Sequence, residues 1–333
     1  MNRIKEREIR EISITRVFLS WKTLAAVIIA AIIIYAFFHG FKKEDIIRLG
    51  SYMRQINPAV FALAFVSYYL GYVFLGWRYK ILLKNCGVDI SIWRGTITCL
   101  MGAATNAALP TKVGDLYRAY LLRKYEQVPV GQGLGANMGE RFLDLAFAFS
   151  SLFIISQFLF TWATQGSNIV IHLIIASSSS LLGLITLVLI LLLIPATRRL
   201  VLAIFPGRTR LFMTGFINGV TGSLHHNWPW LILSTAMVWA AESLRLYFVT
   251  IALGVVMTIP QIVFIVMATT LLAAIPISFS GLGLVEGGAT SLLKLFRIDT
   301  ALGLATIICD RLISFASVVV LGFIAFLFIK DAS

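Results

Sequence analysis

Hydrophobic residues form long runs along this chain, and polar residues are confined to short stretches between them. Six runs reach the length of about 20 residues that a helix needs to cross the hydrocarbon core of a bilayer. These runs cover residues 21–39, 58–77, 143–162, 169–194, 230–253 and 302–328. The pattern predicts an all-α polytopic integral membrane protein with about six full spans.

Two further apolar stretches contain residues that break helices. Residues 92–122 are interrupted at Pro110 and Gly114. Residues 260–295 are interrupted at Pro276, Gly281 and Gly283. Non-helical backbone at membrane depth must face protein or a water-filled cavity, which favours two re-entrant broken-helix hairpins. Reading each stretch as a full span gives eight spans instead, and the parity of the crossings does not separate the two alternatives.

A short motif occurs at both breaks. The sequence Ala-Ala-Leu-Pro ends at Pro110, and Ala-Ala-Ile-Pro ends 166 residues later at Pro276. Repeated, interrupted hydrophobic segments indicate a transporter fold built from inverted repeats, with a binding site where the repeats meet. We therefore expect a single transmembrane domain over residues 21–330, with repeat halves at approximately 58–162 and 230–328.

Composition and charge support a membrane location. The chain is 59% hydrophobic and 13% charged, with a mean hydropathy of +0.90, whereas soluble domains carry about 25% charged residues. Its net charge of +13 comes from Lys and Arg beside the apolar runs, eight of them in residues 78–124. This distribution favours anionic lipid headgroups over nucleic acid as the partner. It also predicts a multi-pass protein of the cell (inner or plasma) membrane with a cytoplasmic N-terminus, preceded by a basic interfacial segment at residues 1–20.

Ten ionisable residues lie in or beside the apolar segments, where a charge costs roughly 2.5–3.5 kcal/mol on insertion scales. They are Asp115, Arg118, Glu140, Arg141, Asp144, Glu242, Arg245, Glu286, Asp310 and Arg311. Three i,i+3 pairs can meet on one helix face: Asp115 with Arg118, Arg141 with Asp144, and Glu242 with Arg245. One interpretation is that such pairs are salt bridges that hold the hairpins to the long helices. The other is a central polar cavity, in which arginines bind a phosphate and acids balance them or contact an ammonium group.

The helix breaks add secondary candidates for substrate binding. Helices that begin after Pro110 and Pro276 would present free backbone N–H groups, which favour an anion. The secondary candidates are Asn106, Lys112, Glu242, Arg245 and Ser280. Capping of the second helix is the plainer role for Ser280.

Motifs of soluble enzymes are missing from the sequence. The run Gly131-x-Gly133-x-Gly135 has no preceding strand, and no Walker-type GxxxxGK(S/T), GxSxG or HExxH occurs. The three cysteines and four histidines lack the spacing of metal ligands. We therefore expect no catalytic residue, no metal and no cofactor, and the sequence favours a transporter over an enzyme.

Ordered motifs in both halves resemble those of a known family. They are Asn106-x-x-x-Pro110, Gly114-Asp115-x-x-Arg118, Glu140-Arg141-x-x-Asp144, Pro276 with Ser280-Gly281-x-Gly283-x-x-Glu286, and Asp310-Arg311. The pattern is similar to the transmembrane domain of lysylphosphatidylglycerol synthases/flippases and their stand-alone relatives, over about residues 21–330. The resemblance implies an integral membrane fold, lipid translocation, and roles for Asp115, Arg118, Glu140, Arg141, Asp144, Glu286 and Arg311. Relatives often read Pro-Gly-Gly-x-Gly at the second break, where this chain has Phe-Ser-Gly-Leu-Gly ending at Gly283.

We expect a lipid flippase or transporter that moves an anionic or modified lipid, aminoacylated or polyprenyl-phosphate-linked, between leaflets through a central polar cavity. Its partners would be membrane lipids with a phosphate-bearing headgroup, together with a separate lipid-modifying enzyme or a second copy of the chain. Without an aminoacyl-transferase domain, this chain is not expected to synthesise lysyl-lipid. Two alternatives stay open: an integral transferase acting on phospholipid or polyprenyl-phosphate, and a non-transporting subunit of a lipid-modifying or glycosylation system.

Overall fold

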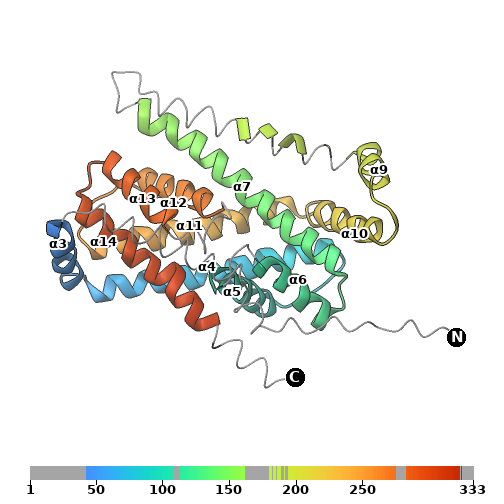
Figure 1. Cartoon of the computed structure of the whole chain (residues 1–333), viewed down its shortest axis with the longest axis horizontal. Helices are drawn as coiled ribbons and strands as arrows, with labels where there is room; N and C mark the ends of the chain where they lie inside the picture. The colour runs from blue at the N-terminus through green and yellow to red at the C-terminus, as the bar shows by residue number, and fades with distance from the viewer. Residues whose placement is uncertain are drawn as a thin grey trace.

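A computed structural model describes residues 43–108, 113–161, 194–274 and 283–322, with a few positions between 180 and 191 and residue 324. All regular secondary structure in these ranges is helical, as the sequence predicts (Figure 1). The helices are α3 (Lys43–Arg54), α4 (Pro58–Asn85), α5 (Ile92–Ala108), α6 (Val113–Glu126), α7 (Val130–Thr161), α9 (Pro195–Ala203), α10 (Gly207–Ser223), α11 (Trp228–Ala252), α12 (Ile259–Ala274), α13 (Leu284–Leu295) and α14 (Thr300–Arg311), the last continued by a π-helical turn at Leu312–Ser317.

Four helices in the described residues are long and apolar enough to cross a membrane. They are Pro58–Asn85, Val130–Phe158, Trp228–Ala252 and Thr300–Gly322, and they correspond to four of the six predicted runs. The runs 21–39 and 169–194, like the interfacial segment 1–20, fall wholly or largely outside the described residues. The chain is therefore an all-α polytopic membrane protein, as expected.

Two of the long helices extend further than the hydrophobic pattern predicts. Helix α4 continues past residue 77 to Asn85, and α7 begins at Val130 instead of near residue 143. The extra turns contain charged residues and glycines, which lower mean hydropathy without stopping a helix. Arg78 directly follows the predicted run 58–77, and its side chain is fully buried inside the fold.

Each of the two broken stretches folds as an antiparallel helical hairpin. Near the turn between α5 and α6, the Gly114 N–H donates to the Asn106 side-chain oxygen over 2.7 Å. At the open end of the same hairpin, Arg94 pairs with Glu126 at 2.8 Å. The 12 residues of α13 span only about 18 Å, well short of the roughly 30 Å of a hydrocarbon core. The turns that carry Pro110 and Pro276 lie outside the described residues.

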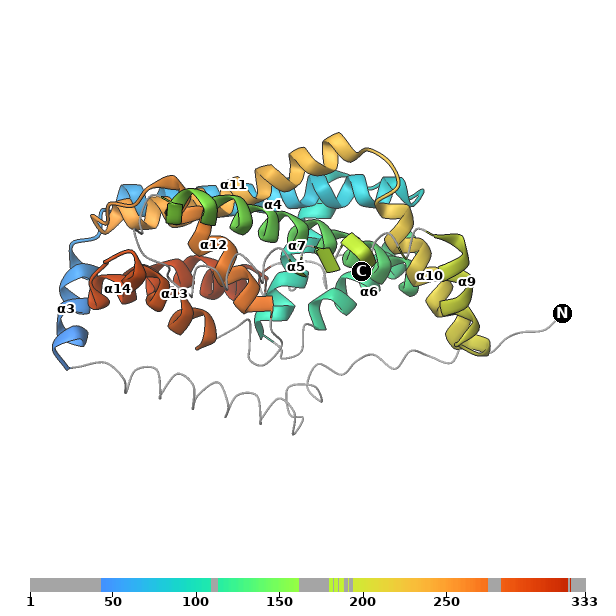
Figure 2. The ribbon, with the colours of Figure 1, turned by 90° about the horizontal axis from the view of Figure 1, so that it is seen from above.

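Helices α4 and α11 form an antiparallel pair that runs along one side of the molecule (Figure 2). The Ser67 hydroxyl donates to the Ala241 carbonyl near the middle of the pair, over 2.8 Å. At one end the Asn57 N–H donates to the Ala252 carbonyl over 2.9 Å, and at the other the Asn85 amide donates to the His226 carbonyl. In the same view both hairpins lie beneath this pair (Figure 2).

The same order of elements occurs in both halves of the described chain. In the first half α4 is followed by the α5–α6 hairpin and then by α7 (Figure 1). In the second half α11 is followed by the α12–α13 hairpin and then by α14. The opening helices of the two halves, α4 and α11, run antiparallel.

Glycines bring α7 and α10 into close contact. Side chains added at Gly131 and Gly135 of α7 would overlap the carbonyl oxygens of Phe212 and Phe216, and Gly219 of α10 approaches α7 as closely. Small residues at four-residue spacing allow helix backbones to approach in this way. The glycine-rich run that does not fit a dinucleotide motif is therefore a helix-packing surface.

Candidate functional site

A deeply buried ion pair joins the first hairpin to α7. Arg118 of α6 donates through both terminal nitrogens to the two carboxylate oxygens of Glu140, over 3.2 and 2.7 Å. Both side chains are almost fully buried. The Arg118 guanidinium also stacks on the Tyr79 ring of α4, 4.2 Å from its centroid. This fork geometry is the one that arginine uses to hold carboxylate or phosphate.

Arg78 of α4 contacts both Glu140 and a second carboxylate of α7, that of Asp144. Its guanidinium donates to Asp144 over 2.7 Å and lies 3.6 Å from Glu140. The Thr235 hydroxyl of α11 accepts a second hydrogen bond from Arg78 over 3.3 Å. Sequence analysis missed Arg78 because it directly follows an apolar run. The available signal was that Arg78 lies one helical turn before Leu82 and Leu83. All three side chains are buried.

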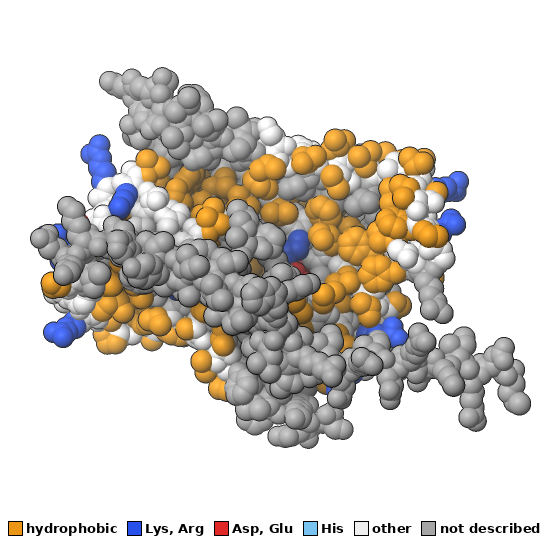
Figure 3. All heavy atoms as spheres, in the orientation of Figure 1, with side chains coloured by type: hydrophobic (Ala, Val, Ile, Leu, Met, Phe, Trp, Pro, Cys, Tyr) orange, Lys and Arg blue, Asp and Glu red, His pale blue; other side chains and the backbone are white. Residues whose placement is uncertain are grey.

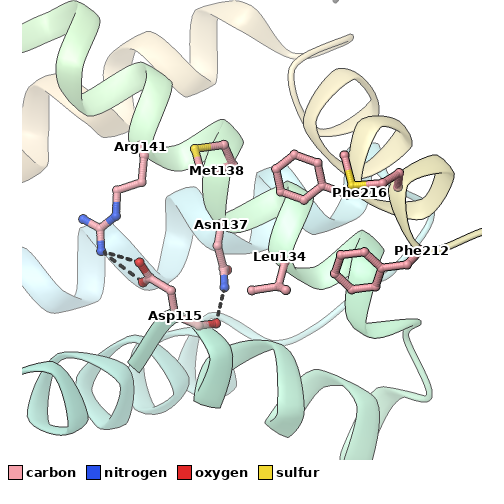
Figure 4. A pocket seen from close by; sticks show the side chains of 8 residues that line it. Asp115, Leu134, Asn137, Met138, Arg141, Phe212 and Phe216 are labelled. Carbon is pink, nitrogen blue, oxygen red and sulfur yellow. Dashed lines mark hydrogen bonds and ion pairs between the residues drawn. The ribbon is translucent and has the colours of Figure 1, made fainter. Parts of the chain in front are cut away.

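Asp115 and Arg141 form the most accessible ion pair of this group. The Arg141 guanidinium donates to the Asp115 carboxylate over 3.1 Å and lies 4.0 Å from Asp144 (Figure 4). The Arg141 side chain is 38% exposed and that of Asp115 is 23% exposed. Asp115 therefore pairs with Arg141 across two helices, and Arg118 pairs with Glu140. The expected i,i+3 contact between Asp115 and Arg118 is replaced by these bonds, whereas that between Arg141 and Asp144 is present.

The second half contains its own ion pairs. Arg245 of α11 contacts Glu242 at 3.0 Å, as the i,i+3 spacing predicts, and Asp310 of α14 at 3.1 Å. The Tyr68 ring lies against the same guanidinium, at 5.1 Å.

Glu286 and Arg311 connect the second hairpin to α14. The Arg311 Nε donates to the Glu286 carboxylate over 2.7 Å. The other carboxylate oxygen of Glu286 accepts from the Gly283 N–H and so caps the start of α13. Directly after Arg311, α14 changes to a π-helical turn whose Ser314 carbonyl accepts from the Tyr68 hydroxyl. Such turns are frequent at functional positions in helices, and the sequence gives no indication of this one.

One ion pair occurs at matching positions in both halves. In the first half, Arg78 of the opening helix bonds to Asp144 of the closing helix, 66 residues later. In the second, Arg245 of the opening helix bonds to Asp310 of the closing helix, 65 residues later. Each half is thus braced across its hairpin by an arginine and an aspartate in the same order.

The two groups of charges differ in their balance. The first group contains three arginines and three carboxylates: Arg78, Arg118, Arg141, Asp115, Glu140 and Asp144. The second contains two arginines and three carboxylates: Arg245, Arg311, Glu242, Glu286 and Asp310. Among the residues described, the first group is neutral and the second has one excess negative charge.

The remaining candidates take other positions. Asn106 lies at the turn of the first hairpin and holds the Gly114 N–H, which is a structural role. Lys112 and Ser280, with the prolines of both breaks, fall outside the described residues. No group of three or more His, Cys, Asp or Glu that could hold a metal ion is found in the part of the chain that the structure describes.

These observations define the class of the protein: a polytopic helical membrane protein with paired arginines and carboxylates in its interior. Residues 23–322 match the family described as the lysylphosphatidylglycerol synthase TM region, so the chain belongs to that family. This match confirms the resemblance seen in the motifs.

Two archaeal proteins of Methanocaldococcus jannaschii are similar to this chain over most of their length. The UPF0104 membrane protein MJ1078 is 32% identical over 225 residues, which make up 68% of this chain and 94% of the relative. The UPF0104 membrane protein MJ1595 is 26% identical over 296 residues, or 82% of this chain and 86% of the relative.

Proposed function

We propose that this protein is a lipid flippase or transporter that carries a phosphate-bearing lipid between the leaflets of the cell membrane. The headgroup would pass along the interior charges while the acyl chains stay in the bilayer. The substrate class is an anionic or modified lipid, either aminoacylated or polyprenyl-phosphate-linked. The observation that carries the proposal is the set of buried arginine–carboxylate pairs in a chain that belongs to a lipid-linked membrane family.

Exchange of ion-pair partners would provide the mechanism. A guanidinium binds a phosphate in the same forked geometry with which it binds a carboxylate. A lipid phosphate can therefore replace Asp115 as the partner of Arg141. Neither the phosphate nor the guanidinium then stays unpaired in a medium of low dielectric constant. Glu140 and Asp144 each have two arginines within reach, whereas Asp115 is 23% exposed and would be hydrated when a phosphate displaces it from Arg141. The free energy cost of moving the headgroup is lowered because full desolvation of an unpaired ion is avoided.

The excess negative charge of the second group supports a modified lipid as substrate. Glu242 is partly exposed and has Arg245 as its cationic partner. An ammonium group on an aminoacylated headgroup would balance this carboxylate while the phosphate is held by an arginine. This division of roles would favour zwitterionic or cationic lipid headgroups over simple anionic ones.

Charge distribution supports an orientation with a cytoplasmic N-terminus. The ends of α4 and α6 and the start of α9 carry Lys80, Lys84, Arg123, Lys124, Arg198 and Arg199. These ends lie on one side of the molecule, toward α10 (Figure 1). Since basic residues are enriched on the cytoplasmic side of membrane proteins, we assign this side to the cytoplasm. The hairpins would then be re-entrant from opposite faces.

The test is headgroup-resolved lipid translocation in proteoliposomes. We expect Arg141→Ala and Glu286→Gln to slow leaflet exchange about tenfold or more, the scale of one lost charge-assisted hydrogen bond. Arg141→Lys should retain part of the rate, because lysine keeps the positive charge but lacks the forked donor geometry of arginine. The matched control is Arg94→Gln, which removes an exposed ion pair with Glu126 and should leave exchange unchanged. Wild-type exchange no faster than that of protein-free liposomes, for anionic, aminoacylated and polyprenyl-phosphate lipids alike, would contradict the proposal.

A further inference from the structure

A hollow of about 290 Å³ lies where α6, α7 and α10 meet. One corner is charged and is formed by Asp115 and Arg141 (Figure 4). The rest of the wall is apolar and includes Met138 of α7 with Phe212 and Phe216 of α10. Its volume is near the lower limit of pockets that hold small ligands, about 300 Å³. The hollow therefore offers one anion-binding corner and an apolar surface beside it.

Arg141 is the accessible guanidinium of the interior charges. Its side chain is 38% exposed, compared with 1%, 4%, 8% and 16% for Arg78, Arg118, Arg245 and Arg311. The other arginines reach a ligand only after the protein opens. A phosphate that arrives from outside the fold would meet Arg141 first.

The apolar wall continues onto the outer surface of the protein. Phe212 is 43% exposed and Met138 is 40% exposed. Figure 3 shows hydrophobic side chains over much of the face that carries α7 and α10, with basic and acidic side chains in a small recess among them. Such an apolar face fits contact with acyl chains better than contact with water. The hollow opens onto this face.

We infer that this hollow is the docking site of a membrane phospholipid, whose phosphate binds Arg141 and one of whose acyl chains packs against α10. The inference rests on the proposed function and deepens it, because it assigns the position at which the lipid leaves the bilayer. A free phosphate would leave the Phe212 and Phe216 wall exposed to water, whereas an acyl chain covers it. Helix α10 lies in the segment that connects the two halves, so this segment would form part of the site at which the lipid enters.

Photolabelling of the full-length protein in liposomes tests this site. The probe is phosphatidylglycerol with a diazirine on one acyl chain, and labelled peptides are mapped by mass spectrometry. Met213→Trp would fill the hollow from α10, since Met213 lines it. Leu211→Trp is the matched control, because Leu211 is on the same helix and is 77% exposed.

We expect labelling of residues 207–223 above that of other lipid-facing helices, and a decrease of about fivefold in Met213→Trp because acyl contacts are lost. Leu211→Trp should label like the wild type, and glycerol phosphate should not compete. Uniform labelling that Met213→Trp does not change would overturn the site, as would competition by glycerol phosphate, which would indicate a soluble-anion site. Labelling requires no translocation, so a specific label with no leaflet exchange would contradict the transport proposal alone.

Discussion

At the scale of single residues, the interior is organised by arginines from different helices. Arg78 illustrates what a hydrophobicity pattern cannot provide. Its side chain bonds to Asp144 of α7 and to Thr235 of α11, so its burial depends on partners 66 and 157 residues away. Arg118, Glu140 and Arg141 were predictable as interior charges because a charge within an apolar run needs a partner. Which acid each arginine binds was not predictable, because pairing across helices depends on tertiary packing.

Removing Arg78 should strongly destabilise the protein. Arg78→Ala leaves Asp144 and Glu140 buried with fewer partners, which in proteins typically costs about 3–5 kcal/mol of the free energy of unfolding. Thermal unfolding in detergent measures the effect. Lys80→Ala is the control on the same helix, since Lys80 forms an exposed pair with Asp89 that should contribute less than about 1 kcal/mol. Equal effects of the two substitutions would show that the buried pair does not hold α4 to α7.

At the scale of elements, the sequence predicts which helices exist better than where they end. Runs without charges identify four of the long helices, and paired prolines and glycines identify both hairpins. The start of α7 and the end of α4 were missed because the glycines and charged residues there lie outside the apolar runs that define the predicted spans. The contact between α7 and α10 was also missed, because a glycine run does not show which helix packs against it.

The glycine contact between α7 and α10 should tolerate no side chain. In Gly135→Ala the new Cβ would overlap the Phe216 carbonyl oxygen, so the helices must separate. We expect a loss of about 1–3 kcal/mol in stability, the usual cost of overpacking, with lower yield of monodisperse protein in gel filtration. Gly50→Ala in α3 is the matched control, because a Cβ there meets no atom within 4 Å. Unchanged unfolding in Gly135→Ala would show that α10 is not packed on α7 in this way.

At the scale of the whole molecule, two halves with the same order of elements meet along the antiparallel pair α4 and α11. Duplicated motifs in the sequence suggested repeats, and the matching braces Arg78–Asp144 and Arg245–Asp310 add a structural correspondence. Sequence analysis did not predict these ion pairs, since Arg78 was not among the ten candidate interior charges. The division into halves at 58–162 and 230–328 stays a prediction that cross-linking can test.

A disulfide between the halves should form in one register only. A Cβ at Gly71 would lie 3.3 Å from that of Ala241, close to the roughly 3.5–4.5 Å of a disulfide. In a background without Cys86, Cys99 and Cys309, Gly71→Cys with Ala241→Cys should oxidise readily, as peptide mapping would show. Transport that requires the halves to move against each other should stop on oxidation and return on reduction.

The control for this experiment places one cysteine on the outside of α4. Val66 is 63% exposed, so Val66→Cys with Ala241→Cys should not form a bond. Cross-linking of both variants to the same extent would contradict the packing of α4 on α11. A locked variant that still exchanges lipid at the wild-type rate would show that this interface is static during transport.

The neutrality of the first group of charges has a further consequence. Its three arginines and three carboxylates are one another's counterions, so this group needs no dissolved ions to neutralise it. Salt in the surrounding water screens charges over a Debye length of about 8 Å at physiological ionic strength, but it acts on exposed pairs far more than on buried ones. The attraction within these buried pairs is therefore set by the sequence and depends little on the salt concentration of the cell.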